Sequence, residues 1–160
     1  MSNNPTNGLK ITMEFIGIFI LSAAINFSTV YEDGKQIGNP LLIILAFYSA
    51  ITITRSVSGG HINPAVTLAV YFEKPSEIRS KEQPLLTLYV LAQFLGAIAA
   101  CLFSFVFYKE NVFKLAINAN NIPMNAFIIE IIATALFTYS ILCQGIKIKK
   151  YLIRKIYKFT

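Results

Sequence analysis

The stretch SGGHINPAVT, residues 58–67, decides how this chain folds. Pro64 lacks a backbone N–H and has a φ that already suits a helix, which places it at the first helical position. Asn63 then occupies the N-cap, where its side chain suits the free N–H groups of the first turn. The apolar residues that follow predict a short helix over about residues 64–72. At about 1.5 Å per residue, this helix covers roughly half of a ~30 Å hydrocarbon core and cannot span it.

Four long apolar runs surround the short helix and predict a membrane-embedded bundle. They cover residues 9–31, 41–57, 85–108 and 124–145, close to or above the length of about 20 residues that a spanning helix needs. A half-length helix between such runs is re-entrant, and non-helical backbone at that depth persists only inside protein or along water. The sequence therefore predicts an all-α membrane protein with four transmembrane helices and one re-entrant half-helix beside a pore.

The composition excludes several classes of function. Of the 160 residues, 55% are hydrophobic and 14% are charged, against about 25% charged in an ordinary soluble domain. The net charge of +6 comes from residues between and after the apolar runs, so no single basic face predicts a nucleic-acid partner. Cys101 and Cys143 lie inside apolar runs and are expected to be buried free thiols. No nucleophile, metal cluster or phosphate loop stands out, so we expect neither an enzyme nor a cofactor.

Lysine and arginine residues predict the orientation in the membrane. With the N-terminus inside, the inner side carries the basic tail at residues 147–160 together with Lys10, Lys74, Arg79 and Lys81. The outer loops then carry only Lys35, Lys109 and Lys114. By the positive-inside rule, both termini are cytoplasmic and the half-helix enters from that side. The basic tail either only fixes the topology or also contacts anionic lipid. The sequence does not decide between a plasma membrane and a vacuolar membrane.

Two segments of the sequence are similar to each other, and this similarity supports an inverted repeat. Residues 14–22, EFIGIFILS, align without gaps on residues 130–138, EIIATALFT, and each segment begins with a carboxylate. Because an odd number of predicted spans separates the two copies, they cross the bilayer in opposite directions, as in an inverted-topology repeat.

These motifs together resemble the aquaporin and aquaglyceroporin family, the major intrinsic proteins. Residues 58–67 look like the family's first Asn-Pro-Ala loop, residues 14–17 like its first-span motif, residues 92–97 (AQFLGA) like its third-span motif, and Glu130 like the glutamate that opens its second half. The resemblance implies a passive channel for water and for small neutral solutes such as glycerol or urea, without a cofactor. It also implies an inverted-repeat helical bundle that sits in lipid as a homotetramer in its complete form.

The chain departs from the family pattern in its second half. A full member has a second Asn-Pro-Ala half-helix followed by the arginine of the selectivity constriction. Here the remaining Asn-Pro pairs, Asn4-Pro5 and Asn39-Pro40, are not followed by Ala. We therefore expect an incomplete bundle, which is a truncated product, an incomplete sequence or a natural short form. The alternative function is a non-conducting subunit that associates with full-length channels and modulates their assembly or trafficking.

The resemblance implies a pore lining built from the half-helix and the loop before it. Asn63, with Pro64 and Ala65, would donate a hydrogen bond to a passing solute while the positive end of the helix disfavours cations. The alternative for Asn63 is a plain helix cap. The carbonyls that would guide the solute belong to Gly59, Gly60, His61 and Ile62. For the side chain of His61, a water-contacting or gating role and a purely structural role both stay open.

Three polar residues inside the apolar runs are expected to support the loops. Glu14, Gln93 and Glu130 are costly in lipid unless paired, and the resemblance implies that the two carboxylates hydrogen-bond the re-entrant loops. A proton relay is the alternative for the carboxylates, and Gln93 is expected to join helices.

The second apolar run supplies two candidates for the constriction. Ile43 lies where the family places a constriction residue, and Phe47 is one turn away. An aliphatic residue there would leave a wider pore for glycerol or urea, while lipid-facing or core packing is the alternative for both.

Overall fold

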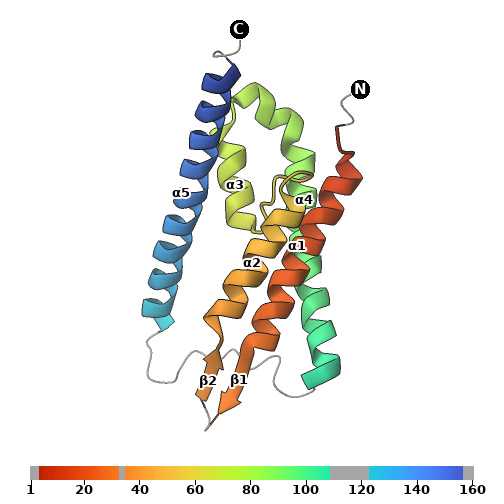
Figure 1. Cartoon of the computed structure of the whole chain (residues 1–160), viewed down its shortest axis with the longest axis vertical. Helices are drawn as coiled ribbons and strands as arrows, with labels where there is room; N and C mark the ends of the chain where they lie inside the picture. The colour runs from red at the N-terminus through yellow and green to blue at the C-terminus, as the bar shows by residue number, and fades with distance from the viewer. Residues whose placement is uncertain (1–3, 33–34, 109–122, 157–160) are drawn as a thin grey trace. The chain divides into compact units, whose positions relative to one another are not determined.

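The computed structural model in Figure 1 describes residues 4–32, 35–108 and 123–156. The chain forms two compact units, Met1–Leu115 and Ala116–Thr160. The first unit holds α1 (Asn7–Ser28), the strands β1 and β2, α2 (Pro40–Thr54), α3 (Pro64–Glu73) and α4 (Ser76–Tyr108). The second holds α5 (Pro123–Ile156).

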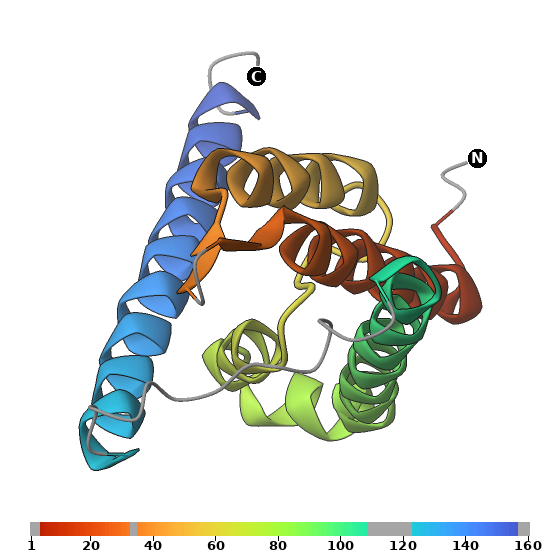
Figure 2. The same cartoon turned by 90° about the horizontal axis from the view of Figure 1, so that it is seen from below.

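In the first unit, α1 is the central helix. It packs against both α2 and α4, and α3 packs against α4, so that α1 lies between its two neighbours in Figure 2. Polar and aromatic contacts join α1 to α4. Asn26 Nδ2 donates to Ser104 Oγ at 3.1 Å, and the rings of Phe27 and Phe103 meet edge to face at 5.9 Å.

Two helices of this unit, α2 and α3, begin with an asparagine cap followed by a proline. At α2, the Oδ1 of Asn39 accepts from the N–H groups of Leu41 and Leu42 at 3.1 and 3.3 Å, and Pro40 occupies the first helical position. The pair Asn63-Pro64 begins α3 in the same way. In both places the amide caps free N–H groups, and the proline lacks an N–H that would need a partner.

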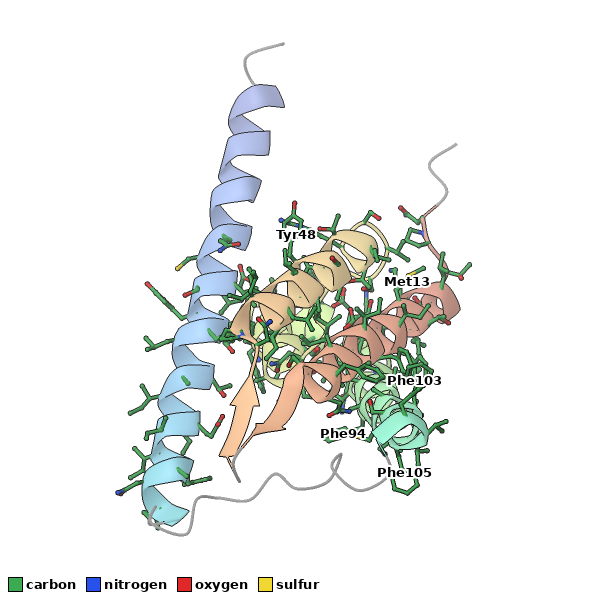
Figure 3. All side chains as sticks on the ribbon, turned by 60° about the horizontal axis from the view of Figure 1, so that its bottom comes forward. Met13, Tyr48, Phe94, Phe103 and Phe105 are labelled. Carbon is green, nitrogen blue, oxygen red and sulfur yellow. The ribbon has the colours of Figure 1, made fainter. Side chains whose placement is uncertain are left out.

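Three of the described helices are long and apolar enough to cross a membrane. These segments are Asn7–Ser28, Ser76–Phe107 and Met124–Gly145. The 15 residues of α2 are also apolar, but they rise only about 22 Å, so a fourth span over residues 41–57 stays a prediction. The surface of the first unit is unlike that of a soluble protein, because Tyr48, Phe94 and Phe105 are all exposed and project outward in Figure 3.

The helices of the structure differ from the expected spans at several boundaries. The first run was predicted to be helical as far as residue 31, but α1 ends at Ser28 and the chain continues into β1 (Thr29–Glu32), which pairs with β2 (Lys35–Gly38). The pairing is antiparallel, with Thr29 opposite Gly38 and Glu32 opposite Lys35. Thr29, Val30 and Tyr31 are β-branched or aromatic residues, which favour extended backbone. Apart from this hairpin, the secondary structure described is helical.

The third span was predicted to start at residue 85, whereas α4 starts nine residues earlier at Ser76 and carries Pro84 inside the helix. Figure 1 shows α4 bending near its N-terminal end, the part that contains this proline. Proline inside a helix removes one hydrogen bond and bends the axis without always ending the helix. In the second unit, α5 likewise continues past the predicted end at residue 145 and runs through the first part of the basic tail to Ile156.

Candidate functional site

The N-terminus of α3 is capped by Asn63. The residue has extended backbone angles (φ −160°, ψ 128°), and its Oδ1 accepts from the N–H of Ala65 at 2.7 Å and of Val66 at 3.4 Å. Because both contacts are backbone donors, the atom that faces them is the oxygen, and the Nδ2 amide points away from the helix with its hydrogens available. Asn63 thus caps the helix through its oxygen, and its Nδ2 amide remains as a hydrogen-bond donor at the positive end of the helix.

The loop before α3 takes a left-handed path. Gly59 and Gly60 have φ of +99° and +67°, and Ile62 has φ of +38°. Glycine adopts these angles freely, whereas for a β-branched residue the left-handed region costs about 1–2 kcal/mol. The Ile62 side chain is nevertheless only 1% exposed. Strain of this kind persists only where surrounding contacts hold the backbone in place.

Glu14 of α1 supplies those contacts. Its carboxylate is completely buried, and Oε1 accepts from Ser58 Oγ at 2.6 Å and from the N–H of His61 at 3.1 Å. Oε2 accepts from the N–H of Ile62 at 2.7 Å and from Gln93 Nε2 at 2.8 Å. Four donors around two oxygens fit the acceptor-only carboxylate form. One side chain of α1 therefore holds the loop and α4 together.

A second set of bonds connects α4 to α3. Gln93 Nε2 also donates to Thr67 Oγ1 at 3.0 Å, while Gln93 Oε1 is buried and has no partner in the described chain. Thr67 Oγ1 lies 2.9 Å from the carbonyl oxygen of Asn63 and 3.3 Å from His61 Nδ1. One turn before Gln93, the hydroxyl of Tyr89 donates to the carbonyl of Ser58 at 2.9 Å. The loop is thus fixed from three helices.

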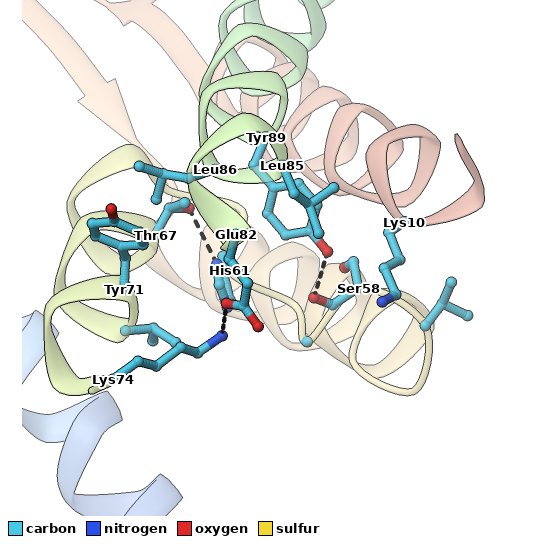
Figure 4. Close-up of a pocket in the computed structure, with 13 residues that line it drawn as sticks. Lys10, Ser58, His61, Thr67, Tyr71, Lys74, Glu82, Leu85, Leu86 and Tyr89 are labelled. Carbon is cyan, nitrogen blue, oxygen red and sulfur yellow. Dashed lines mark hydrogen bonds and ion pairs between the residues drawn. The ribbon is translucent and has the colours of Figure 1, made fainter. Parts of the chain in front are cut away.

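A cavity of about 230 Å³ opens beside this network. Figure 4 shows it between the loop, α3 and the first part of α4, with the side chains of His61, Thr67 and Tyr89 in its wall. An ion pair between Lys74, which follows α3, and Glu82 of α4 also borders it. The cavity therefore has a polar side, made by the loop and this pair, and an apolar side that includes Leu85 and Leu86.

The imidazole of His61 lies in the connection between α2 and α3, on the cavity wall. Burial lowers the pKa of this ring below the usual 6.5. The charge of Glu14 acts in the opposite direction and raises the pKa. Of the two remaining charges, Lys74 lowers the pKa and Glu82 raises it. Desolvation disfavours the charged form of a buried base. His61 is therefore a neutral ring at neutral pH, with one nitrogen as a donor and the other as an acceptor.

The remaining predicted site residues lie apart from this network. Ile43 and Phe47 are half-buried on α2 and are not among the residues that line the cavity. Glu130 is exposed on α5, in the second unit. Their expected roles, in the constriction and in loop support, stay predictions.

Several residues of the site were not predicted as site residues from the sequence, among them Ser58 and Lys74. Thr67 follows Asn63 by four residues, and Tyr89 precedes Gln93 by four, so each lies on the same helix face as a residue that was singled out. That spacing is the signal that could have found them. Glu82 carried no such signal, because the third span was expected to start only at residue 85.

The comparison with known families settles what kind of protein carries this site. A model of the major intrinsic protein family matches residues 7–156. The chain belongs to the major intrinsic protein family. This result confirms the resemblance seen in residues 58–67 and the predicted aquaporin-like helical bundle, and it places the chain among integral membrane proteins.

Individual relatives are distant and longer. An aquaglyceroporin of Toxoplasma gondii is 27% identical over 136 residues, which cover 85% of this chain and 50% of the relative. A probable aquaporin, NIP7-1 of Arabidopsis thaliana, is 31% identical over 139 residues, 83% of this chain and 49% of the relative. The propanediol uptake facilitator PduF of Salmonella typhimurium is 39% identical over 102 residues, 61% of this chain and 37% of the relative.

The chain spans about half the length of the first two of these relatives. No solved structure matches it significantly.

Proposed function

We propose that this protein is a passive channel for water and small neutral solutes such as glycerol or urea, with residues 59–65 in the wall of the pore. The support from relatives is that proteins named aquaporin, aquaglyceroporin and propanediol uptake facilitator match the chain. The observation that carries the proposal is the geometry of Asn63. Its oxygen is used by the helix cap, and its amide hydrogens remain for a solute.

The mechanism requires only hydrogen-bond exchange. A solute oxygen would accept from Asn63 Nδ2 while solute hydrogens bind the carbonyls that the left-handed backbone at Gly59, Gly60 and Ile62 redirects. The N-terminal end of α3 carries a partial positive charge, which raises the barrier for cations and protons but leaves neutral solutes unaffected. No covalent step is involved, so we propose a channel and not an enzyme.

The same proposal extends to the setting of the pore. The protein would lie in a lipid bilayer with both termini cytoplasmic and would assemble as a homotetramer in its complete form. The cavity beside His61 would then be the cytoplasmic entrance, bordered by Lys74 and Glu82.

The proposal is tested by osmotic swelling and proton leak of vesicles that contain the purified protein in its complete form. Asn63→Asp keeps the oxygen that caps α3 but removes the donor and adds a negative charge. We expect lower water permeability and a larger cation or proton leak. Asn39→Asp is the matched control, because it changes the same kind of cap at α2, and we expect it to behave as wild type.

Two outcomes would overturn the proposal. Equal swelling and leak for wild type and Asn63→Asp would remove Asn63 from the pore. No swelling by wild type, combined with co-purification on a full-length channel, would instead support the modulating subunit.

A further inference from the structure

The hydroxyl of Thr67 has one hydrogen and three polar neighbours. These are the carbonyl oxygen of Asn63 at 2.9 Å, Gln93 Nε2 at 3.0 Å and His61 Nδ1 at 3.3 Å. A hydroxyl donates once and accepts up to twice. Assigning each hydrogen therefore determines which nitrogen of the His61 ring is protonated.

The orientation of Gln93 is fixed by Glu14. The amide atom that faces Thr67 also lies 2.8 Å from Glu14 Oε2. An amide oxygen there would oppose a carboxylate oxygen inside a buried network, whereas the amide nitrogen has two hydrogens for the two acceptors. Gln93 is thus a donor to Thr67 and occupies one of its two lone pairs.

The single hydrogen of Thr67 goes to the Asn63 carbonyl. That oxygen is the nearer acceptor, at 2.9 Å compared with 3.3 Å for His61 Nδ1. It is also the carbonyl four residues earlier in the helix, the usual partner of a threonine hydroxyl. Thr67 Oγ1 then has only a lone pair to offer the ring.

We propose that Thr67 is a positioning residue that holds His61 as its neutral Nδ1–H tautomer, so that Nε2 presents a lone pair to the cavity. The hydrogen bond made by one ring nitrogen sets the state of the other. His61 lines the cavity, its Nε2 lies beside Gly59, and no group in the part of the chain that the structure describes forms a hydrogen bond with Nε2. The edge-to-face contact with Tyr89, at a ring separation of 5.5 Å, holds the plane of the ring.

The consequence for transport rests on the proposed function and makes its solute class more specific. Nε2 and the neighbouring carbonyls all accept hydrogen bonds, so this mouth of the pore favours solutes that donate through O–H or N–H groups. Water, alcohols and polyols meet that requirement. An aprotic solute of similar size does not.

The tautomer can be measured directly, because His61 is the only histidine in the sequence. Protein labelled with ¹⁵N-histidine gives a single pair of ring-nitrogen signals, in which the protonated and unprotonated nitrogens are well separated. In lipid at neutral pH we expect Nδ1 protonated and Nε2 unprotonated. A wild-type spectrum with Nε2 protonated would overturn the proposal.

Two substitutions test the role of Thr67. Thr67→Ser keeps the hydroxyl, and we expect the wild-type tautomer. Thr67→Val has nearly the same shape but lacks the hydroxyl, and we expect the Nε2–H tautomer to rise at least several-fold. An unchanged tautomer in Thr67→Val would show that Thr67 does not set it. If Thr67→Val does not fold, loss of the Nδ1–H form in Thr67→Ser would equally contradict the proposal.

The measurement involves no transport. A failed swelling assay with the expected tautomer would count against the channel and leave the assignment of Thr67 standing.

Discussion

Gly96 of α4 lies directly against the backbone of Phe15 on α1, so that a Cβ atom at Gly96 would stand only 2.5 Å from the Phe15 carbonyl oxygen. Backbone cannot rotate out of the way as a flexible side chain can. The two helices therefore depend on glycine at this position for their close approach.

Gly96→Ala is expected to lower the free energy of unfolding. Overpacking typically costs about 1–3 kcal/mol, more than the 0.5–1 kcal/mol or so that alanine gains over glycine inside a helix. The measurement is the free energy of unfolding from SDS titration in detergent micelles. Gly145→Ala is the control, because a Cβ there meets nothing within 4 Å. Equal stability of Gly96→Ala and Gly145→Ala would contradict the close approach.

A second glycine contact joins α1 to the left-handed loop. A Cβ at Gly17 would overlap Cγ2 of Ile62, so Gly17→Ala is expected to destabilise the protein. Ile62→Ala removes the obstructing atom at a cost of about 2–5 kcal/mol for the lost burial. The double variant should therefore be more stable than the sum of the two single effects by about 0.5–3 kcal/mol. Strict additivity in the same unfolding assay would show that the two residues do not touch.

Loss of the Glu14 carboxylate should destabilise the loop. Glu14→Ala leaves the donors from Ser58, His61, Ile62 and Gln93 unsatisfied, and each buried donor without a partner costs about 1–3 kcal/mol. Glu14→Gln keeps one oxygen and should cost less. SDS titration measures both variants, and hydrogen exchange at the amides of His61 and Ile62 should rise more in Glu14→Ala. Unchanged exchange would show that Glu14 does not hold the loop.

The two roles of Asn63 can be separated by stability. Asn63→Ala removes the cap and should cost about 1 kcal/mol, whereas Asn63→Asp keeps an acceptor at the positive end of α3 and should be at least as stable as wild type. The matched pair Asn39→Ala and Asn39→Asp should show the same order, since Asn39 caps α2 in the same manner. Equal stability of Asn63→Ala and Asn63→Asp would mean that the side chain contributes nothing as a cap.

His61 should make stability depend on pH in a known direction. Burial lowers the pKa of the folded ring, while the unfolded chain keeps the ordinary value near 6.5. As the pH falls below that value, the unfolded chain takes up a proton that the folded protein does not, so the free energy of unfolding decreases. Between about pH 7.5 and pH 5.5, wild type should lose more stability than His61→Gln. An equal loss would contradict the lowered pKa.

The sequence predicts local features of this protein well. Pro64 and Asn63 specify the start of α3 because a cap and a missing N–H act within one turn, independently of distant contacts. The apolar runs predict helices because their composition fits a membrane interior. The apolar runs do not by themselves determine the helix boundaries, since Thr29, Val30 and Tyr31 favour a strand at the end of α1 and residues 76–83 favour a helix despite Pro84. In both places, competing local preferences had to be resolved by the folded chain.

The motif at residues 58–67 by itself determined that a short capped helix begins at Pro64, because those preferences are carried by asparagine and proline over a few bonds. Only the tertiary structure decided that Glu14 meets four donors, that Gln93 donates to Thr67, and that Lys74 pairs with Glu82. Most of these partners lie far apart in the sequence and are joined through helix packing. A hydrogen bond is directional and acts over about 3 Å, so the partners of each polar group depend on where packing places the helices.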